Sequence, residues 1–317
     1  MANKTWVVSV VFCFLFSFVH ITKAGQDRVA KAKELEAAKL LNKMNKSAVK
    51  SLKSPDGDII DCVHILHQPA FDHPKLKNHK IQYATTEVKK DKYYGAKATI
   101  NVWRTHVQQH SEYSLSQIWV INQDDNDNVE SVEGGWQVNP LLCGDDKPRF
   151  YAYWTSDSYG RTGCYNLRCS GFVQVSNIVA LGAIIQPLSI YGGTQYDISL
   201  LIWKDPRSGN WWLRAQDINM GYWLASMLDS RSESATIVQW GSEEIYTIEM
   251  GSGYFSKEGY GKAGYFEQLS TVNENNTLVT PDNFKVFASK PIDLKPVING
   301  DVRFSYGGPG RNSNCPI

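Results

Sequence analysis

Two glutamates in the second half of the chain have neighbours that could support acid–base chemistry. Glu133 lies in the run Ser131–Val138, which reads SVEGGWQV, and Glu243 lies in Gln239–Ile245, which reads QWGSEEI. Both segments therefore place a glutamate beside Gly, Gln and Trp. A carboxyl in such a setting is a candidate general acid or base, and a solvated position on a strand is the alternative.

The positions of the histidines exclude several other reaction classes. All seven histidines lie at or before His110. A Ser-His-Asp triad, a Cys-His pair and a His-ligated zinc all require imidazole. Acid–base chemistry in the second half must therefore use carboxylates supported by tyrosines and amides. The cysteines lack the paired C-x-x-C spacing of zinc sites, so no metal and no cofactor is predicted.

If both segments are strands, alternate residues share a face. Glu133 then lies on one face with Gly135 and Gln137, whereas Trp136 points to the other. The same spacing places Glu243 with Gly241 and Gln239. The candidate carboxyls are Glu133 and Glu243, which this spacing alone does not bring together. Gln137, Trp136 and Trp240 are candidates for support of the oxyanion or the substrate, and a cross-strand structural amide is the alternative role of Gln137.

Repeated strand signals follow Tyr93, and polar turns separate them. The predicted strands are Ala96–Trp103, Tyr113–Ile121, Arg149–Trp154, Tyr196–Trp203 and Trp211–Ala215. Lys204–Asn210 is predicted to join the last two as a hairpin. Helical periodicity is confined to Gln26–Lys46 and a short stretch at Tyr222–Leu228. This pattern predicts an all-β fold, an antiparallel β-sandwich or barrel, preceded by a small N-terminal segment with a helix.

The first residues predict export. Lys4 precedes the apolar run Trp6–Val19, and Ala24 ends a short stretch with small residues at cleavage spacing, as in a secretory signal peptide. The alternative, a membrane anchor, requires about 20 apolar residues. The formal net charge of +1 gives no indication of a nucleic-acid partner or an anionic membrane surface.

Export also makes disulfides and glycans expected. Cys164 and Cys169 are the best pair, closing a short loop, with two buried free thiols as the alternative. Asn275 and Asn45 head glycosylation sequons. Four further side chains form a histidine cluster that would gain charge on mild acidification, with a metal site as the weaker alternative: His64, His67, His73 and His79.

Several motifs, in a shared order, resemble the plant neprosin family of glutamic peptidases. Lys50–Val63 and Gln68–Pro74 resemble the activation peptide of that family. Five further segments resemble parts of the family's catalytic domain: Tyr93–Ala98, Ser116–Trp119, Tyr153–Asp157, Gly163–Leu167 and Gly307–Asn312.

The resemblance implies a β-sandwich peptidase made as a zymogen, with two catalytic glutamates that fall on Glu133 and Glu243. Glu244 is the substitute for Glu243 in this assignment. The resemblance also implies cleavage after proline in peptide or protein substrates, and inhibition by the enzyme's own propeptide. The implied plan is a signal peptide over 1–24, an activation propeptide over 25–90 and a catalytic domain over 91–317. The expected location is extracellular, in the apoplast, with the vacuole as the alternative.

The chain departs from the family pattern in three places. A segment with Cys-Pro and Pro-Ile-Arg-Arg motifs is missing before Tyr93. A family cysteine is absent around Pro291–Pro296, and Cys143 replaces a tyrosine, so that a Cys143–Cys315 bridge is one alternative pairing. The alternative functions are a catalytically inactive relative and a carbohydrate- or wall-binding sandwich. Carboxyls of Glu133 and Glu243 within hydrogen-bonding or one-water reach inside a cleft favour a peptidase, and carboxyls on opposite faces favour a binding protein.

Overall fold

The computed structural model describes residues 48–53, 59–63, 81–228, 233–245, 248–289, 293–296 and 302–310. The chain divides into two compact units, Met1–His79 with Asn314–Ile317, and Lys80–Ser313. The described part of the first unit is an antiparallel pair of strands, β1 (Ala48–Lys53) and β2 (Ile59–Val63). Within the described ranges no helix is long and apolar enough to cross a membrane.

Some predicted features lie outside the described residues. They are the signal peptide, the helix over 26–46, the sequon at Asn45, the histidine cluster and Cys315.

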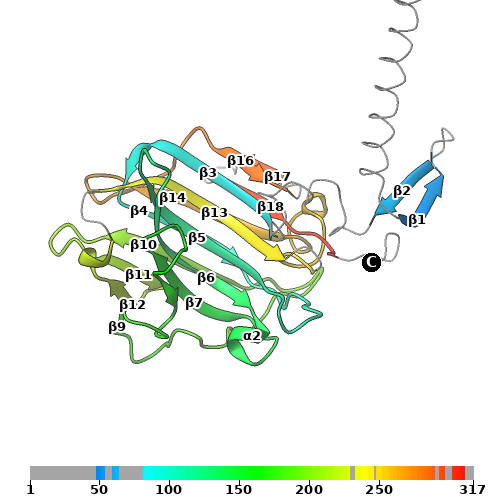
Figure 1. Ribbon diagram of the computed structural model, residues 1–317, viewed down its shortest axis with the longest axis horizontal. Helices are drawn as coiled ribbons and strands as arrows, with labels where there is room; N and C mark the ends of the chain where they lie inside the picture. Colours follow the sequence, from blue (N-terminus) through cyan, green and yellow to red (C-terminus); the bar gives the residue numbers. More distant parts are fainter. Residues whose placement is uncertain are drawn as a thin grey trace, which may run out of the picture. The chain divides into compact units, whose positions relative to one another are not determined.

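The second unit is built from two antiparallel sheets, whose strands are counted here over the described residues (Figure 1). The seven-stranded sheet has the order β16 (Lys285–Ala288), β3 (Ile81–Tyr93), β13 (Ala235–Ile245), β5 (Ser114–Gln123), β6 (Val129–Val138), β7 (Arg149–Thr155) and β8 (Cys164–Tyr165). The nine-stranded sheet has the order β17 (Asp293–Pro296), β18 (Val302–Tyr306), β14 (Gly264–Val272), β4 (Gly95–Asn101), β10 (Asp197–Lys204), β11 (Trp211–Ala215), β12 (Ile218–Trp223) and β9 (Phe172–Gln174), with β15 (Leu278–Val279) paired to β14. The predicted all-β antiparallel sandwich is confirmed.

Alternation along the strands sends one set of apolar side chains into a core between the sheets. Trp136 of β6 and Trp240 of β13 are fully buried there. Each indole Nε1–H donates to a carbonyl of β4 in the facing sheet, at Asn101 and Lys97 respectively, over 3.0 Å. Because both buried donors are satisfied, these tryptophans fill the core without a polar penalty and tie the two sheets together.

The predicted strands agree with the observed ones to within a few residues, and Trp211–Ala215 coincides with β11. The Lys204–Asn210 segment joins β10 to β11, which pair as the predicted hairpin. The helix predicted over Tyr222–Leu228 is wrong apart from one turn of 3-10 helix, Ala225–Met227. Tyr222 and Trp223 instead continue β12, since pairing with β11 and β9 satisfies their backbone groups.

The strand β3 lies across the boundary expected at residues 90 and 91. It pairs with β13 along most of its length and with β16 on its other side. The sandwich unit therefore begins at Lys80. The site of propeptide cleavage stays a prediction.

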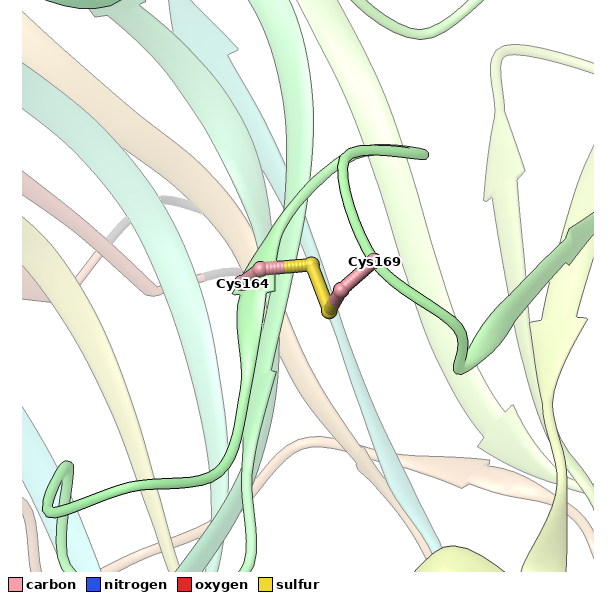
Figure 2. Close-up of a disulfide and its surroundings, with 2 residues drawn as sticks. All are labelled: Cys164 and Cys169. Atoms are coloured by element: carbon pink, nitrogen blue, oxygen red, sulfur yellow. A yellow bond between two sulfur atoms is a disulfide. The ribbon is translucent and has the colours of Figure 1, made fainter.

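The Cys164–Cys169 disulfide is confirmed and closes the loop after β8, with 6.1 Å between the two Cα atoms (Figure 2). Among the described residues, Cys143 is a free thiol in α2 (Pro140–Cys143). Asn275 lies exposed in the turn before β15, where its backbone N–H donates to Asn273 Oδ1. Its glycosylation stays a prediction.

Gly135 allows β5 and β6 to approach closely. A Cβ atom there would lie 2.1 Å from the Ser116 carbonyl oxygen and 2.5 Å from Gln117 Cβ. We expect Gly135→Ala to lower the free energy of unfolding by about 3 kcal/mol or more, because backbone must move to relieve the overlap. Urea denaturation measures the change.

Gly134→Ala is the matched control for that substitution. Its Cβ would face the core and meet the end of the Leu213 side chain at 3.0 Å. We expect a loss of about 1 kcal/mol, because a side-chain end shifts more easily than backbone. Equal losses in the two variants would contradict the close-approach argument.

Candidate active site

Glu133, Gln117 and Glu243 lie on one face of the seven-stranded sheet, which we call the carboxylate face. They come from β6, β5 and β13, which are adjacent in the order β6–β5–β13. Trp136 on β6 and Trp240 on β13, each three residues from one of the glutamates, point into the core between the sheets. Since alternate residues of a strand face opposite ways, the carboxylate face is turned away from that core.

Gln117 lies at the centre of this face. It is opposite Gly135 on β6 and Gly241 on β13, and it is almost fully buried. Its Nε2–H donates to Glu133 Oε2 over 2.7 Å, and its Oε1 accepts a hydrogen bond from the Tyr151 hydroxyl. With both ends of the amide engaged, Gln117 is fixed in one orientation and can hold Glu133 in place.

Glu133 is a buried carboxyl with several donors. Its side chain is only 4% exposed. Besides Gln117, the hydroxyls of Ser131 and Tyr159 donate to Oε1 over 2.6 and 2.7 Å. Burial raises the pKa of Glu133, and the hydrogen bonds from Ser131, Tyr159 and Gln117 oppose that rise because they favour the ionised form.

Glu243 is partly exposed and has fewer donors. The Tyr113 hydroxyl donates to its Oε1 over 2.5 Å. Burial raises the pKa of Glu243 to about 7, the Tyr113 hydrogen bond opposes the rise, and the negative charge of Glu133 adds to it. The two carboxyls therefore interact, and Glu243 keeps its proton to a higher pH than an ordinary glutamate does.

The register indicates how the two glutamates are spaced. Glu133 is opposite Trp119 and Glu243 is opposite Leu115, so they differ by four residues along β5 and by two strand spacings across it. On a flat sheet that places their Cα atoms roughly 16 Å apart. The Glu133 side chain extends toward Gln117, which is two residues nearer to the Glu243 position along β5. Among the described residues no hydrogen bond joins the two carboxyls, and Gln117 lies between.

Tyrosines surround the pair. Tyr153 on β7 is opposite Glu133, and its ring lies 4.7 Å from the ring of Tyr165 and 6.0 Å from that of Tyr159. Tyr165 also packs against Tyr151, and it follows Cys164 of the disulfide directly. The described groups that donate to Glu133 and Glu243 are phenols, an amide and a serine hydroxyl.

The remaining candidates are divided between the two faces. Trp136 and Trp240 are in the core, so they hold the sheets together and do not line the carboxylate face. Glu244 is fully buried on the core side, whereas Glu243 shares the carboxylate face with Glu133. Gln137 is on the carboxylate face, where its Oε1 accepts from Asn139 Nδ2 over 3.1 Å. An oxyanion role for Gln137 stays a prediction.

Sequence reasoning missed Gln117, Tyr113 and Tyr159. A buried glutamine within an apolar strand is a detectable signal, but its pairing with Glu133 depends on a register that the sequence does not state. Tyr159 lies in a turn with a positive φ of 62°, and nothing in its neighbours indicates a contact with Glu133. Among the described residues, no group of three His, Cys, Asp or Glu side chains could hold a metal ion.

The fold shows distant likenesses to solved structures. Scytalido-glutamic peptidase with a peptide-based transition-state analog is 12% identical, with a TM-score of 0.37 and coverage of 71% of this chain and 98% of its own. SCP-B of the eqolisin family of peptidases, in complex with the tripeptide Ala-Ile-His, is 10% identical, with a TM-score of 0.39 and the same two coverages. CG-16, a homodimeric agglutinin from chicken liver, is 8% identical over 52% of this chain and 95% of its own, with a TM-score of 0.26. These likenesses are too weak to bear on function.

Two family models match the sequence itself. The model described as Neprosin matches residues 110–309, which is more than half of the 317 residues and includes both glutamates. The model described as Neprosin activation peptide matches residues 51–129. The first match supports a peptidase, and the second supports a propeptide of the enzyme's own that inhibits it. The resemblance noted in the sequence is confirmed, and the chain belongs to the neprosin family.

Proposed function

We propose that the chain is the precursor of a glutamic endopeptidase in which Glu133 and Glu243 activate a water molecule against a peptide carbonyl. The observation that carries the proposal is the placement of both glutamates on one face, in unequal environments, on either side of Gln117. A protein whose glutamates had no joint role would not require both carboxyls to be sheltered together.

The unequal environments of the two carboxyls support different roles for them. Three donors favour the ionised form of Glu133, and one donor serves Glu243, which also experiences the charge of Glu133. Glu133 therefore ionises first and is the general base. Glu243, with a pKa of about 7, is the general acid.

The reaction follows from these protonation states. Glu133 removes a proton from water as the water oxygen attacks the carbonyl carbon. Glu243 donates a hydrogen bond to the developing oxyanion and then protonates the leaving nitrogen, so that the C–N bond breaks. Gln117 and Tyr159 keep the Glu133 carboxylate oriented throughout.

Further features of the proposal draw on the family resemblance. They are cleavage after proline, export to the apoplast or the vacuole, and restraint by the propeptide until mild acid charges the histidine cluster. Activity below neutral pH agrees with Glu243, which must be protonated to act as the acid.

We expect Glu133→Gln and Glu243→Gln each to reduce hydrolysis of a proline-containing peptide by at least about 100-fold, since the amide can neither accept nor supply the proton. The acid-treated precursor is assayed between pH 3 and 7, with fragments identified by mass spectrometry. The exposed Glu274→Gln is the matched control. Full activity in either site variant with native circular dichroism would contradict the pair, and an inactive wild type would indicate a non-catalytic relative.

The raised pKa of Glu243 also predicts how stability depends on pH. An unfolded glutamate titrates at about pH 4.3, so the folded state binds the extra proton and stability falls as pH rises from there to about 7. Glu243→Gln removes this cost. We expect the variant to exceed the wild type in unfolding free energy at pH 8 by on the order of 2 kcal/mol, and to match it at pH 4, in urea titrations. If Glu243→Gln were less stable than the wild type by the same amount at pH 4 and pH 8, the raised pKa of Glu243 would be refuted.

One observation favours a second candidate function, binding of wall carbohydrate. Trp203, Trp212 and Tyr222 are in register across β10, β11 and β12, with ring centroids 6.0 and 4.9 Å apart. Partly exposed aromatic rings of this kind can stack on sugars. Under this candidate, Trp212→Ala abolishes retention on an insoluble polysaccharide while Glu133→Gln retains it. Wild-type protein that is not retained would rule the candidate out.

A further inference from the structure

The strand next to Glu243 comes from the part of the chain that also matches the activation peptide. Tyr83 on β3 is directly opposite Glu243 on β13. Directly paired residues of two strands point to the same face, so Tyr83 belongs to the carboxylate face. Residue 83 falls within the 51–129 match to the activation peptide and before the expected processing boundary at residue 90.

Tyr83 is held firmly by residues from the other end of the chain. Its backbone N–H donates to Ser289 Oγ over 2.8 Å, and its carbonyl accepts from the Ser289 N–H over 2.8 Å. Its ring packs on Phe287 with the centroids 5.6 Å apart. The backbone of Tyr83 is therefore held by hydrogen bonds and its ring by packing on Phe287.

The hydroxyl of Tyr83 has no hydrogen bond with any of the described residues. In this respect Tyr83 differs from Tyr113, Tyr151 and Tyr159, whose hydroxyls donate to Glu243, Gln117 and Glu133. Burial raises the pKa of Tyr83, and the charges of Glu243 and Glu133 raise it further. The phenol is therefore a proton-bearing donor within electrostatic reach of both carboxyls.

We propose that Tyr83 contacts the substrate, donating its hydroxyl hydrogen bond to a backbone carbonyl of the bound peptide beside Glu243, and that β3 is retained in the active enzyme. This inference rests on the proposed peptidase function. Activating cleavage must then fall before Ile81, since a cut at residue 90 would remove Tyr83 and most of the strand that pairs with β13 on the side away from β5.

The first test is the substitution Tyr83→Phe in the full-length precursor. Phenylalanine retains the ring that packs on Phe287 and lacks only the hydroxyl. We expect kcat/KM for a proline-containing peptide to fall about 10- to 100-fold, with unchanged pH limits because both carboxyls remain. Tyr260→Phe, at an exposed tyrosine before β14 of the opposite sheet, is the matched control and should retain full activity. Activity of Tyr83→Phe within twofold of the wild type would overturn the substrate contact.

A binding measurement separates this inference from the peptidase proposal. The affinity of the same peptide is compared between the non-hydrolysing Glu133→Gln variant and the double variant Glu133→Gln/Tyr83→Phe. We expect the double variant to bind at least about 5-fold more weakly. Equal affinities would overturn the contact whether or not the wild type hydrolyses the peptide.

The retention of β3 is tested by sequencing the N-terminus of the acid-processed protein and of the core that resists an unrelated protease. Both should begin before Ile81. A processed or resistant core that begins after Tyr83 would overturn the retention of β3, and the resistant core gives this answer even for an inactive wild type.

Discussion

The hydrogen bond from the Gln117 amide to Glu133 is the interaction on which the rest of the site depends. It requires β5 and β6 to approach closely, which Gly135 allows, and it requires the amide to be oriented, which Tyr151 provides. It also favours the ionised form of one glutamate while the other keeps its proton. Without this bond Glu133 would keep only the Ser131 and Tyr159 hydroxyls as donors, and the environments of the two carboxyls would differ less.

Alternate residues of β6 and β13 serve different purposes, since one set packs in the core and the other lies on the carboxylate face. Trp136 of β6 and Trp240 of β13 enter the core and donate to carbonyls of β4. Glu133 and Glu243 are each three residues from one of these tryptophans, and they therefore face away from the core. A one-residue slip in register would exchange the two sets. The donor bonds of Trp136 and Trp240 therefore protect the placement of the glutamates as well as the stability of the core.

Much of this could be predicted from the sequence, for identifiable reasons. Period-two alternation indicates which residues share a face, so Glu133 and Gln137 could be placed together in advance. The lack of histidine after His110 restricted the chemistry to carboxylates. The partners of each strand could not be predicted. Gln117 and Tyr83 come to lie beside Glu133 and Glu243 only through the pairing of β5 with β6 and of β3 with β13, and such long-range pairing leaves no local trace in the sequence.

The pairing of β3 with distant strands has a consequence for the order of events during synthesis. Tyr113 is separated from its partner Glu243 by 130 residues, and Tyr83 is separated from Ser289 by 206. A growing chain that has completed β6 holds Glu133 but lacks the second carboxyl, and the strand that carries Tyr83 has no neighbour to pair with. Such non-local pairing forms late and slowly. The proposed catalytic pair is therefore incomplete until β13 has been synthesised. The order of synthesis itself thus delays the proposed activity.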